Sequence, residues 1–307
     1  MNNTADFSGI HIPLVTPFTS TGELDEKALR TLVDYCITEQ QADGLMPCGT
    51  TGEVPALTFE EHKRVVTIVV NQAKGRVPVI PGTGSNNTAH AIELTRFAEQ
   101  AGCAACLQVT PYYSKPSQDG IVAHFKAIAA GSNLPMILYN IPGRTARNVE
   151  PATILRMAKE ISTIVGVKDA ACDIVQTEAL LQGAASLGRP FVVLTGEDRM
   201  TFLNMCLGGH GAVSAVCHIV GKEYQEMLRL LREQPTGYLE AARVIHYKTL
   251  PVVAALFSEP NPAPTKAALH LMGVLPDDSL RLPLLSMTDV GKEKLKAELK
   301  VLGKVKG

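Results

Sequence analysis

Short apolar runs alternate with longer amphipathic stretches along most of the chain. The runs have the length of buried strands, and the stretches repeat apolar positions every three or four residues, as helices do. The predicted strands are Ile10–Val15, Gly44–Pro47, Val77–Pro81, Cys106–Val109, Pro135–Asn140, Ile164–Lys168, Phe191–Thr195 and Gly211–Ala215. The predicted helices are Asp25–Gln40, Thr58–Ala73, Thr88–Gln100, Ser117–Ala130, Pro151–Lys159, Ile174–Leu187 and Arg199–Leu207.

This alternation predicts an α/β fold, a parallel (β/α)8 TIM barrel. Residues 1–224 are expected to form the catalytic barrel and residues 225–307 a C-terminal helical region packed on it. Thr58 and Glu61 have the spacing of a helix capping box. A doubly wound sheet is the alternative fold. In a barrel, active sites lie at the carboxyl ends of the strands, so the residues there carry the functional prediction.

Composition narrows the class of protein. The 307 residues are 46% hydrophobic and 19% charged, with a formal net charge of −1, which gives no electrostatic reason to expect binding to nucleic acid or to a membrane. No apolar run approaches the ~20 residues of a membrane span, and the polar start Met1–Ser8 does not resemble a secretory signal. We therefore expect a cytoplasmic protein.

The seven cysteines are odd in number and lie in apolar segments, which predicts free buried thiols in a reducing compartment. Cys103 and Cys106 have the spacing of half a zinc site, but no second pair completes it. The histidines show no paired-ligand spacing either, so the sequence predicts no metal site.

Lys168 ends the apolar run Ile164–Val167 and is the first candidate for chemistry. A lysine held where a buried strand stops can be kept as a neutral amine, which attacks carbonyl groups. Most lysines are solvated surface charges, so the assignment depends on what the other strand ends carry.

Two glycine-containing loops follow the second and third predicted strands. In Cys48–Glu53, the hydroxyls of Thr50 and Thr51 together with backbone N–H groups suit a carboxylate or phosphate. Gly82-Thr83-Gly84 begins like a dinucleotide fingerprint, but Asn87 stands where the third glycine is required. A nicotinamide oxidoreductase is therefore disfavoured.

The next two strand ends carry phenols and a guanidinium. Tyr112 and Tyr113 lie in a loop bracketed by prolines, and Tyr139 ends the fifth strand, with Arg144 in the loop after it. Taken singly, each is better explained as a packing or surface residue. On one barrel face with Lys168, they supply a nucleophile, a proton relay and carboxylate sites, which suits Schiff-base chemistry on a 2-oxo acid.

The chain also resembles the dihydrodipicolinate synthase family of class I pyruvate-dependent aldolases, from about Gly9 to at least Leu284. Gly49–Glu53, Tyr139 and Lys168 mark the superfamily, whereas Tyr113 together with Arg144 is more specific to the synthases. The matching segments are Leu14–Phe18, Gly49–Glu53, Pro78–Gly84, Thr110–Pro116, Tyr139–Thr145, Gly166–Asp169, Gly208–Ser214 and Glu259–Lys266.

The resemblance implies a catalytic cycle that starts with pyruvate. Its carboxylate would dock on Thr50 and Thr51, and the Lys168 amine would form an imine with its ketone. Tyr139 would shuttle protons through a hydroxyl relay with Thr50 and Tyr113. The resulting enamine would attack the aldehyde of L-aspartate 4-semialdehyde.

Arg144 would hold the carboxylate of the semialdehyde, and Gly196 and Val213 match positions that line the pyruvate end of the site. The product would be 4-hydroxy-tetrahydrodipicolinate, in the first committed step of lysine and diaminopimelate biosynthesis. The imine of Lys168 is itself the electron sink, so the resemblance implies no cofactor and no metal.

The family also implies self-association. The tyrosine that matches Tyr113 reaches into the site of a neighbouring subunit, which makes a dimer the minimal active unit and a dimer of dimers a common state. Two rival functions remain. One is a sister aldolase such as an N-acetylneuraminate lyase, which acts on another 2-oxo acid. The other is a non-catalytic binding homologue.

Many bacterial members bind lysine as a feedback inhibitor in a cleft between subunits. His62, Asn86 and Tyr112 match that effector cleft. The chain departs from the pattern at other positions of the cleft, namely Val54, Pro55, Phe59 and His90. His90 stands where lysine-sensitive enzymes carry a glutamate.

We expect lysine inhibition to be weak or absent. Without the glutamate carboxylate, the ammonium of bound lysine loses a charged hydrogen bond of ~1.5–3 kcal/mol, or about ten- to a hundredfold in affinity. A steady-state titration with lysine measures the inhibition, and strong inhibition at sub-millimolar lysine would refute the prediction.

Overall fold

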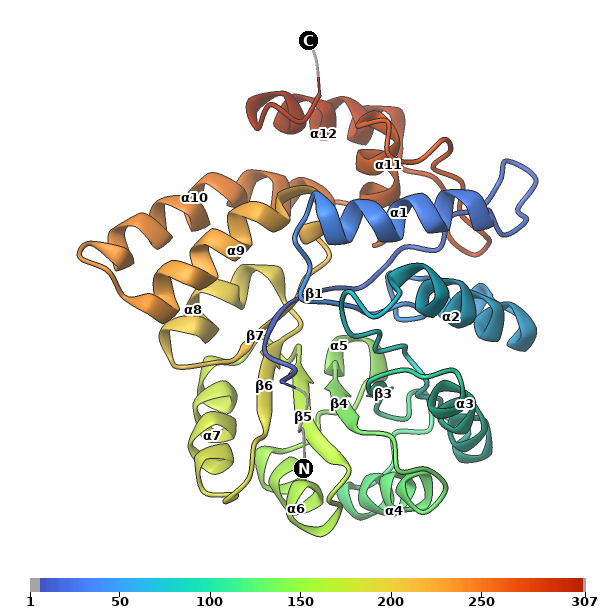
Figure 1. Ribbon diagram of the computed structural model, residues 1–307, viewed down its shortest axis with the longest axis vertical. Coiled ribbons are helices and arrows are strands. Elements are labelled where there is room, and N and C mark those ends of the chain that lie inside the picture. Colours follow the sequence, from blue (N-terminus) through green and yellow to red (C-terminus); the bar gives the residue numbers. More distant parts are fainter. Residues whose placement is uncertain (1–5, 306–307) are drawn as a thin grey trace. The chain divides into compact units, whose positions relative to one another are not determined.

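The computed structural model describes residues 6–305 and divides into two compact units. The first unit is formed by the residues up to Gly9 and by Pro78–Val213. The second unit is formed by Ile10–Val77 and by the chain from Ser214 onward. Strands followed by helices run through most of the chain, as the apolar pattern predicts (Figure 1).

A parallel sheet forms the centre of the first unit. Its strands are β3 (Cys106–Val109), β4 (Met136–Asn140), β5 (Ile164–Asp169), β6 (Val192–Thr195) and β7 (Gly211–Val213), each paired with the next. Nearly every residue of these strands is buried, which explains why they appear in the sequence as continuous apolar runs.

Helices flank the strands of the first unit on the outside (Figure 1). They are α3 (Thr88–Gln100), α4 (Gln118–Ala129), α6 (Pro151–Glu160), α7 (Ile174–Ala185) and α8 (Thr201–Cys206). Asn87, Ser117 and Asp173 cap three of these helices by accepting backbone N–H groups of the first turn. The short helix α5 (Pro142–Thr145) was not predicted, and the predicted helix Arg199–Leu207 begins as the 3-10 turn η2 (Asp198–Met200) before α8.

The predicted strand Val77–Pro81 is wrong as a continuous strand. Only isolated bridges occur there, at Val79 and at Gly82, which pairs with Leu107. The segment does run along β3, because Leu107 N–H donates to the Pro81 carbonyl at 2.8 Å. Proline has no N–H to donate, so Pro78 and Pro81 prevent a regular ladder.

The second unit contains the chain's first strands and helices. β1 (Gly9–Ile12), from Ile10 onward, pairs in parallel with β2 (Gly44–Leu45). Helix α1 (Glu26–Thr38) follows β1, whereas η1 (Val54–Ala56) and α2 (Phe59–Ala73) follow β2. The predicted capping box of α2 is confirmed, because Thr58 Oγ1 accepts from Glu61 N–H and Glu61 Oε2 accepts from Thr58 N–H.

The rest of the second unit is helical, as predicted for the C-terminal region. Its helices are α9 (Cys217–Glu233), α10 (Tyr238–Leu256), α11 (Ala263–Leu271) and α12 (Asp289–Val301). The predicted division after residue 224 falls within α9, and the two-domain boundary stays a prediction.

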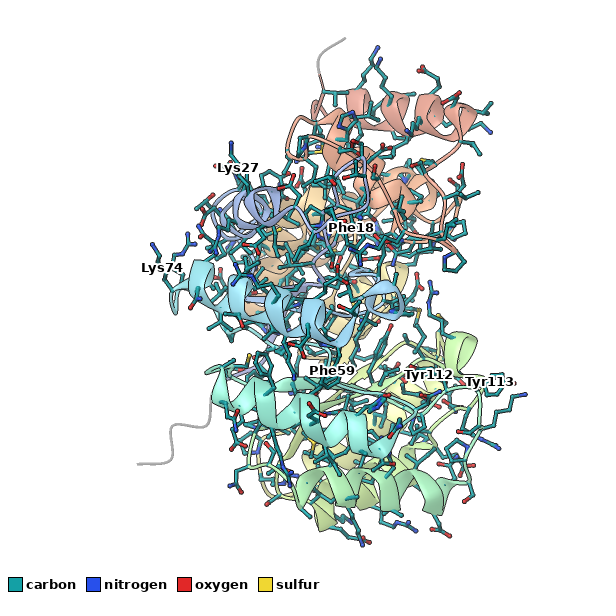
Figure 2. All side chains as sticks on the ribbon, turned by 90° about the vertical axis from the view of Figure 1, so that its right-hand side faces the viewer. Phe18, Lys27, Phe59, Lys74, Tyr112 and Tyr113 are labelled. Atoms are coloured by element: carbon teal, nitrogen blue, oxygen red, sulfur yellow. The ribbon has the colours of Figure 1, made fainter. Side chains whose placement is uncertain are left out.

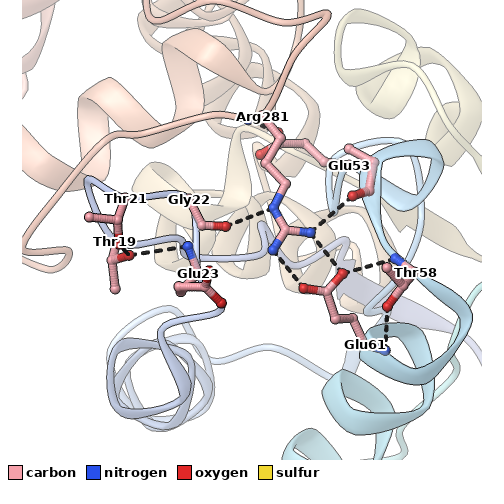
Figure 3. A network of polar contacts seen from close by, with 9 residues as sticks. Thr19, Thr21, Gly22, Glu23, Glu53, Thr58, Glu61 and Arg281 are labelled. Atoms are coloured by element: carbon pink, nitrogen blue, oxygen red, sulfur yellow. Dashed lines mark hydrogen bonds and ion pairs between the residues drawn. The ribbon is translucent and has the colours of Figure 1, made fainter.

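Arg281 ties three segments of the second unit together (Figure 3). Its guanidinium forms a two-pronged ion pair with Glu61, at 2.6 and 2.8 Å, and donates to the carbonyls of Gly22 and Ala56. The hydrogen bonds from Arg281 lower the pKa of Glu61 to about 2. Arg281 also lies over the ring of Phe18, with 4.3 Å from its guanidinium carbon to the ring centroid.

The cysteine prediction is partly wrong. All seven thiols are free, but Cys172 and Cys206 are exposed while the other five are buried. Burial raises the pKa of Cys103 to about 12 and of Cys106 to about 11, which leaves both as inert core thiols. Within residues 6–305, no helix combines the length and apolar character needed to cross a membrane.

Candidate active site

The register of the first unit places Lys168 beside Tyr139. β4 and β5 pair so that Tyr139 lies opposite Lys168, both at carboxyl ends of strands. The Lys168 Nζ atom lies 3.9 Å from the centroid of the Tyr139 ring. Lys168 is only 6% exposed, and Tyr139 is buried as well. The Lys168 amine is thus buried against the face of the Tyr139 ring, which also carries a phenolic hydroxyl.

Gly196 makes room for the Lys168 side chain. It follows β6, and its N–H donates to the Asp169 carbonyl at 2.7 Å. A Cβ at this position would lie 2.7 Å from Lys168 Cε and 3.0 Å from Ala170 Cβ, closer than carbon atoms normally approach. The absence of a side chain at Gly196 therefore sets the path of the lysine.

A buried carboxylate, that of Asp169, directly follows Lys168 in the sequence. Asp169 accepts hydrogen bonds from Asn140 Nδ2 at 2.8 Å and from Gln176 Nε2 at 3.0 Å. Burial raises the pKa of the Asp169 carboxyl above its ordinary range, and the two amide hydrogen bonds oppose that shift. Within the described chain no lysine or arginine forms an ion pair with Asp169, so its carboxylate is stabilised by hydrogen bonds from neutral amides.

The amide network extends into two loops. Asn148 Oδ1 accepts from Asn140 Nδ2 at 2.8 Å, and Asn148 Nδ2 donates to Gln176 Oε1 at 2.8 Å. The Asn148 carbonyl accepts from Gln118 Nε2 at 2.9 Å. One network therefore joins the ends of β4 and β5 to the segment after α5 and to the start of α4. This network was not predicted, and its signal in the sequence is the pair of polar residues, Asn140 and Asp169, that end two apolar runs.

Arg144 lies in α5, the one-turn helix after β4. Pro142 starts this helix, and Ala146 ends it in a left-handed conformation. The Arg144 side chain is exposed, and no carboxylate within residues 6–305 forms an ion pair with it. Its guanidinium is available to a carboxylate from outside the unit.

The two tyrosines after β3 lie at the edge of the first unit (Figure 2). Tyr113 is 91% exposed and Tyr112 is 38% exposed. Tyr113 has a φ of 70°, a left-handed conformation that bulky residues seldom adopt. Tyr113 thus combines a strained backbone conformation with an exposed aromatic side chain.

The predicted carboxylate cradle, Cys48–Glu53, lies in the second unit. Thr51 is buried, Thr50 is partly exposed, and within the described chain no carbonyl accepts the N–H of either residue. The carbonyl of Gly52 accepts from Thr16 Oγ1 at 2.7 Å. The loop is thus held from behind while two backbone donors remain available to an anion.

A buried ion pair closes the loop. Glu53, in a left-handed conformation with φ of 53°, pairs with Lys266 of α11 at 2.5 Å, and both side chains are fully buried. Lys266 Nζ also donates to the Ser279 carbonyl at 2.8 Å and lies over the ring of Phe18. Glu53 Oε2 accepts from the Arg281 N–H. Burial lowers the pKa of Lys266, and the charge of Glu53 opposes that shift.

The predicted site residues thus fall into two groups. Lys168, Tyr139 and Gly196 are brought together in the first unit, which also carries Arg144, Tyr113 and the buried Val213 of β7. Thr50 and Thr51 belong to the second unit. The relay through Thr50, Tyr113 and Tyr139 draws on both units and stays a prediction.

The residues of the predicted effector cleft are divided in the same way. Asn86, His90 and Tyr112 are exposed in the first unit. In the second unit, His62 is buried in α2, Phe59 starts that helix, and Val54 and Pro55 form η1. Binding of an effector by these residues stays a prediction.

Gly84 has a role that differs from nucleotide binding. A Cβ there would lie 2.3 Å from the Val109 backbone nitrogen, so the glycine allows its loop to run against β3. The nucleotide-like glycine pattern is therefore explained by strand packing. Within residues 6–305 no group of three or more His, Cys, Asp or Glu side chains could hold a metal ion.

Comparison with known proteins places these features in context. A model of the dihydrodipicolinate synthetase family matches residues 6–302. A 4-hydroxy-tetrahydrodipicolinate synthase from Syntrophobacter fumaroxidans is 44% identical over 297 residues, covering 97% of this chain and 99% of the relative.

Solved structures agree with this match. A crystal structure of a dihydrodipicolinate synthase aligns with a TM-score of 0.91 at 43% identity, over 97% of this chain and 100% of the other. The Acinetobacter baumannii enzyme, solved in complex with pyruvate, aligns with a TM-score of 0.92 at 38% identity, over 98% and 100% of the two chains. These alignments confirm the predicted fold class, a (β/α)8 barrel with C-terminal helices.

Replacing Gly196 by alanine should displace the Lys168 amine while leaving the fold intact. The added methyl would overlap Lys168 Cε, and a misplacement of ~1 Å in a reacting group can cost about a hundredfold in rate. We expect kcat to fall by that order and the thermal midpoint to change little.

Gly143→Ala is the matched control, because a Cβ there meets nothing within 4 Å. Steady-state kinetics and thermal melting of both variants measure the effect. A Gly196→Ala enzyme with normal kcat would show that this glycine does not set the position of the lysine.

Proposed function

The chain belongs to the dihydrodipicolinate synthetase family, and on this premise we propose that it is a lyase that condenses pyruvate with L-aspartate 4-semialdehyde to 4-hydroxy-tetrahydrodipicolinate. The observation that carries the proposal is the buried Lys168 amine, 3.9 Å from the centre of the Tyr139 ring with Gly196 beside its stem. The pyruvate complex of the Acinetobacter baumannii relative supports the choice of pyruvate.

The first half of the proposed reaction activates pyruvate. The Lys168 nitrogen adds to the ketone carbon, and loss of water gives an imine. The imine withdraws electrons, so a proton leaves the pyruvate methyl group and an enamine forms. Tyr139, whose ring contacts the amine, is suited to carry the protons of these steps.

The second half joins the two substrates. The enamine carbon attacks the aldehyde carbon of the semialdehyde and forms a carbon–carbon bond, while the aldehyde oxygen takes up a proton. The amino group of the semialdehyde then attacks the imine carbon, which closes the ring and releases the Lys168 amine. Because the imine is the electron sink, this scheme includes no metal and no organic cofactor.

The recognition of the two carboxylates is also part of the proposal. Thr50 and Thr51 would bind the pyruvate carboxylate, since both carry a hydroxyl and no carbonyl of the described chain accepts their N–H groups. Arg144 would bind the carboxylate of the semialdehyde, since its guanidinium is exposed and has no carboxylate partner in the described chain. Val213 and Gly196 would line the pyruvate end.

We propose that the active form is a dimer or a dimer of dimers. The support is Tyr113, whose exposed phenol and left-handed backbone suit a residue that completes a neighbouring subunit's site. Relatives include a variant described as the first monomeric dihydrodipicolinate synthase, which fits a family whose members ordinarily associate. Activity should then be lost on dissociation, as measured over a protein concentration series.

The imine can be trapped. Incubation with pyruvate and borohydride should reduce the imine to a stable secondary amine and add the mass of one reduced pyruvate to Lys168. Peptide mass spectrometry locates the adduct, and Lys168→Arg should abolish both the adduct and turnover. Lys266, which is also buried, serves as an internal control because its amine is paired with Glu53. An adduct on any lysine other than Lys168 would end this mechanism.

Arg144 separates the synthase from a sister lyase. Arg144→Ala removes a charged hydrogen bond of ~1.5–3 kcal/mol, so KM for the semialdehyde should rise about ten- to a hundredfold with little change in KM for pyruvate. Arg243→Ala removes the same charge from the exposed face of α10 and should leave both constants unchanged. Unchanged semialdehyde turnover in Arg144→Ala would favour another 2-oxo acid as product or substrate.

A further inference from the structure

A second side chain near α11, besides Lys266, contacts the carboxylate cradle. Asn261, just before this helix, donates from Nδ2 to Thr51 Oγ1 at 3.0 Å. Thr265 Oγ1 in turn donates to Asn261 Oδ1 at 3.4 Å. The two contacts place the amide nitrogen of Asn261 at Thr51 and its amide oxygen at Thr265.

The contact decides what the Thr51 hydroxyl can do. A threonine hydroxyl has one hydrogen to donate and two lone pairs to accept with. When Asn261 donates to the oxygen, the single hydrogen must point elsewhere. Within residues 6–305, no acceptor takes that hydrogen, although Thr51 is only 4% exposed.

We propose that Asn261 is a positioning residue for the substrate carboxylate: by donating to the Thr51 oxygen, it commits the Thr51 hydrogen to the bound carboxylate. The inference rests on the proposed function, in which Thr51 binds pyruvate. A carboxylate accepts hydrogen bonds and donates none, so a hydroxyl with its hydrogen already committed outward binds it without first reorienting.

The loop itself is held by other contacts, so Asn261 acts on the hydrogen rather than on the loop. The Thr16 hydroxyl holds the Gly52 carbonyl, and the buried Lys266–Glu53 pair holds the end of the loop. A Cβ at Gly52 would lie 3.0 Å from the Cys48 backbone nitrogen, which shows how tightly the turn is wound. Changes confined to the Asn261 amide should therefore leave the loop in place.

Asn261→Asp tests the direction of the hydrogen bond. The new carboxylate has nearly the shape of the amide but only accepts, so it would draw the Thr51 hydrogen to itself and add a negative charge. The half-saturating pyruvate concentration for borohydride trapping should rise about ten- to a hundredfold. KM for the semialdehyde and the thermal midpoint should change little. Asn71→Asp, on an exposed position of α2, controls for the added charge.

A pH series separates positioning from a general loss of structure. A protonated carboxyl group can donate, so lowering the pH should bring the pyruvate half-saturation of Asn261→Asp toward that of the wild type at the same pH. Thr265→Val, which removes the contact that orients the amide, should raise the same constant by a smaller factor. It provides the test if Asn261→Asp fails to fold.

A double-mutant cycle identifies Thr51 as the residue through which Asn261 acts. In a Thr51→Val background there is no hydrogen to direct, so Asn261→Leu should add much less than it does in the wild type. Additive effects, or an Asn261→Asp enzyme with wild-type pyruvate saturation, would overturn the inference. If wild-type enzyme gives no pyruvate adduct at Lys168, the proposed function fails instead, so the two failures are told apart.

Discussion

Parallel pairing is the constraint on which the first unit depends. Because neighbouring parallel strands end at the same edge, the pairing of β4 with β5 puts Tyr139 opposite Lys168 and Asn140 opposite Asp169. The Lys168–Tyr139 pair and the Asp169–Asn140 pair are thus consecutive rungs of one ladder. A slip of one residue would turn Lys168 toward the opposite face of the sheet and Asp169 toward the site. The apolar run before Lys168 therefore places the lysine beside Tyr139 as well as filling the core, since it fixes the register.

Two buried carboxylates are stabilised by opposite means. Glu53 forms a buried ion pair with Lys266, and removal of one partner from such a pair costs about 3–5 kcal/mol because the other charge is left buried. Asp169 has only amide donors, from Asn140 and Gln176, and its pKa is raised. The first arrangement locks a loop in a strained conformation. The second holds strand ends together through neutral amide side chains.

The sequence predicted most of the fold because period and length are local signals. The strand ends that carry Lys168 and Tyr139 followed from apolar runs, and the capping box at Thr58 followed from spacing alone. What it missed depends on contacts between distant residues. Nothing local in the sequence indicates that Asn261 meets Thr51, 210 residues away. The segment at Pro81 was misjudged because apolar content does not register a missing N–H donor. The glycine at position 84 was ambiguous for a similar reason, since its use depends on what lies next to it.

The contacts that hold the cradle and those that hold the amine have no residue in common. Glu53, Lys266 and Asn261 all belong to the second unit, whereas Lys168 and Asp169 belong to the first. A substitution in the Cys48–Glu53 loop can therefore change the bonds that hold this loop while the hydrogen bonds of Asp169 keep all their partners. On the proposed function, inherited variation in that loop can alter the recognition of a carboxylate while the residues next to the lysine stay the same. Such modularity offers one scaffold a route to many related substrates.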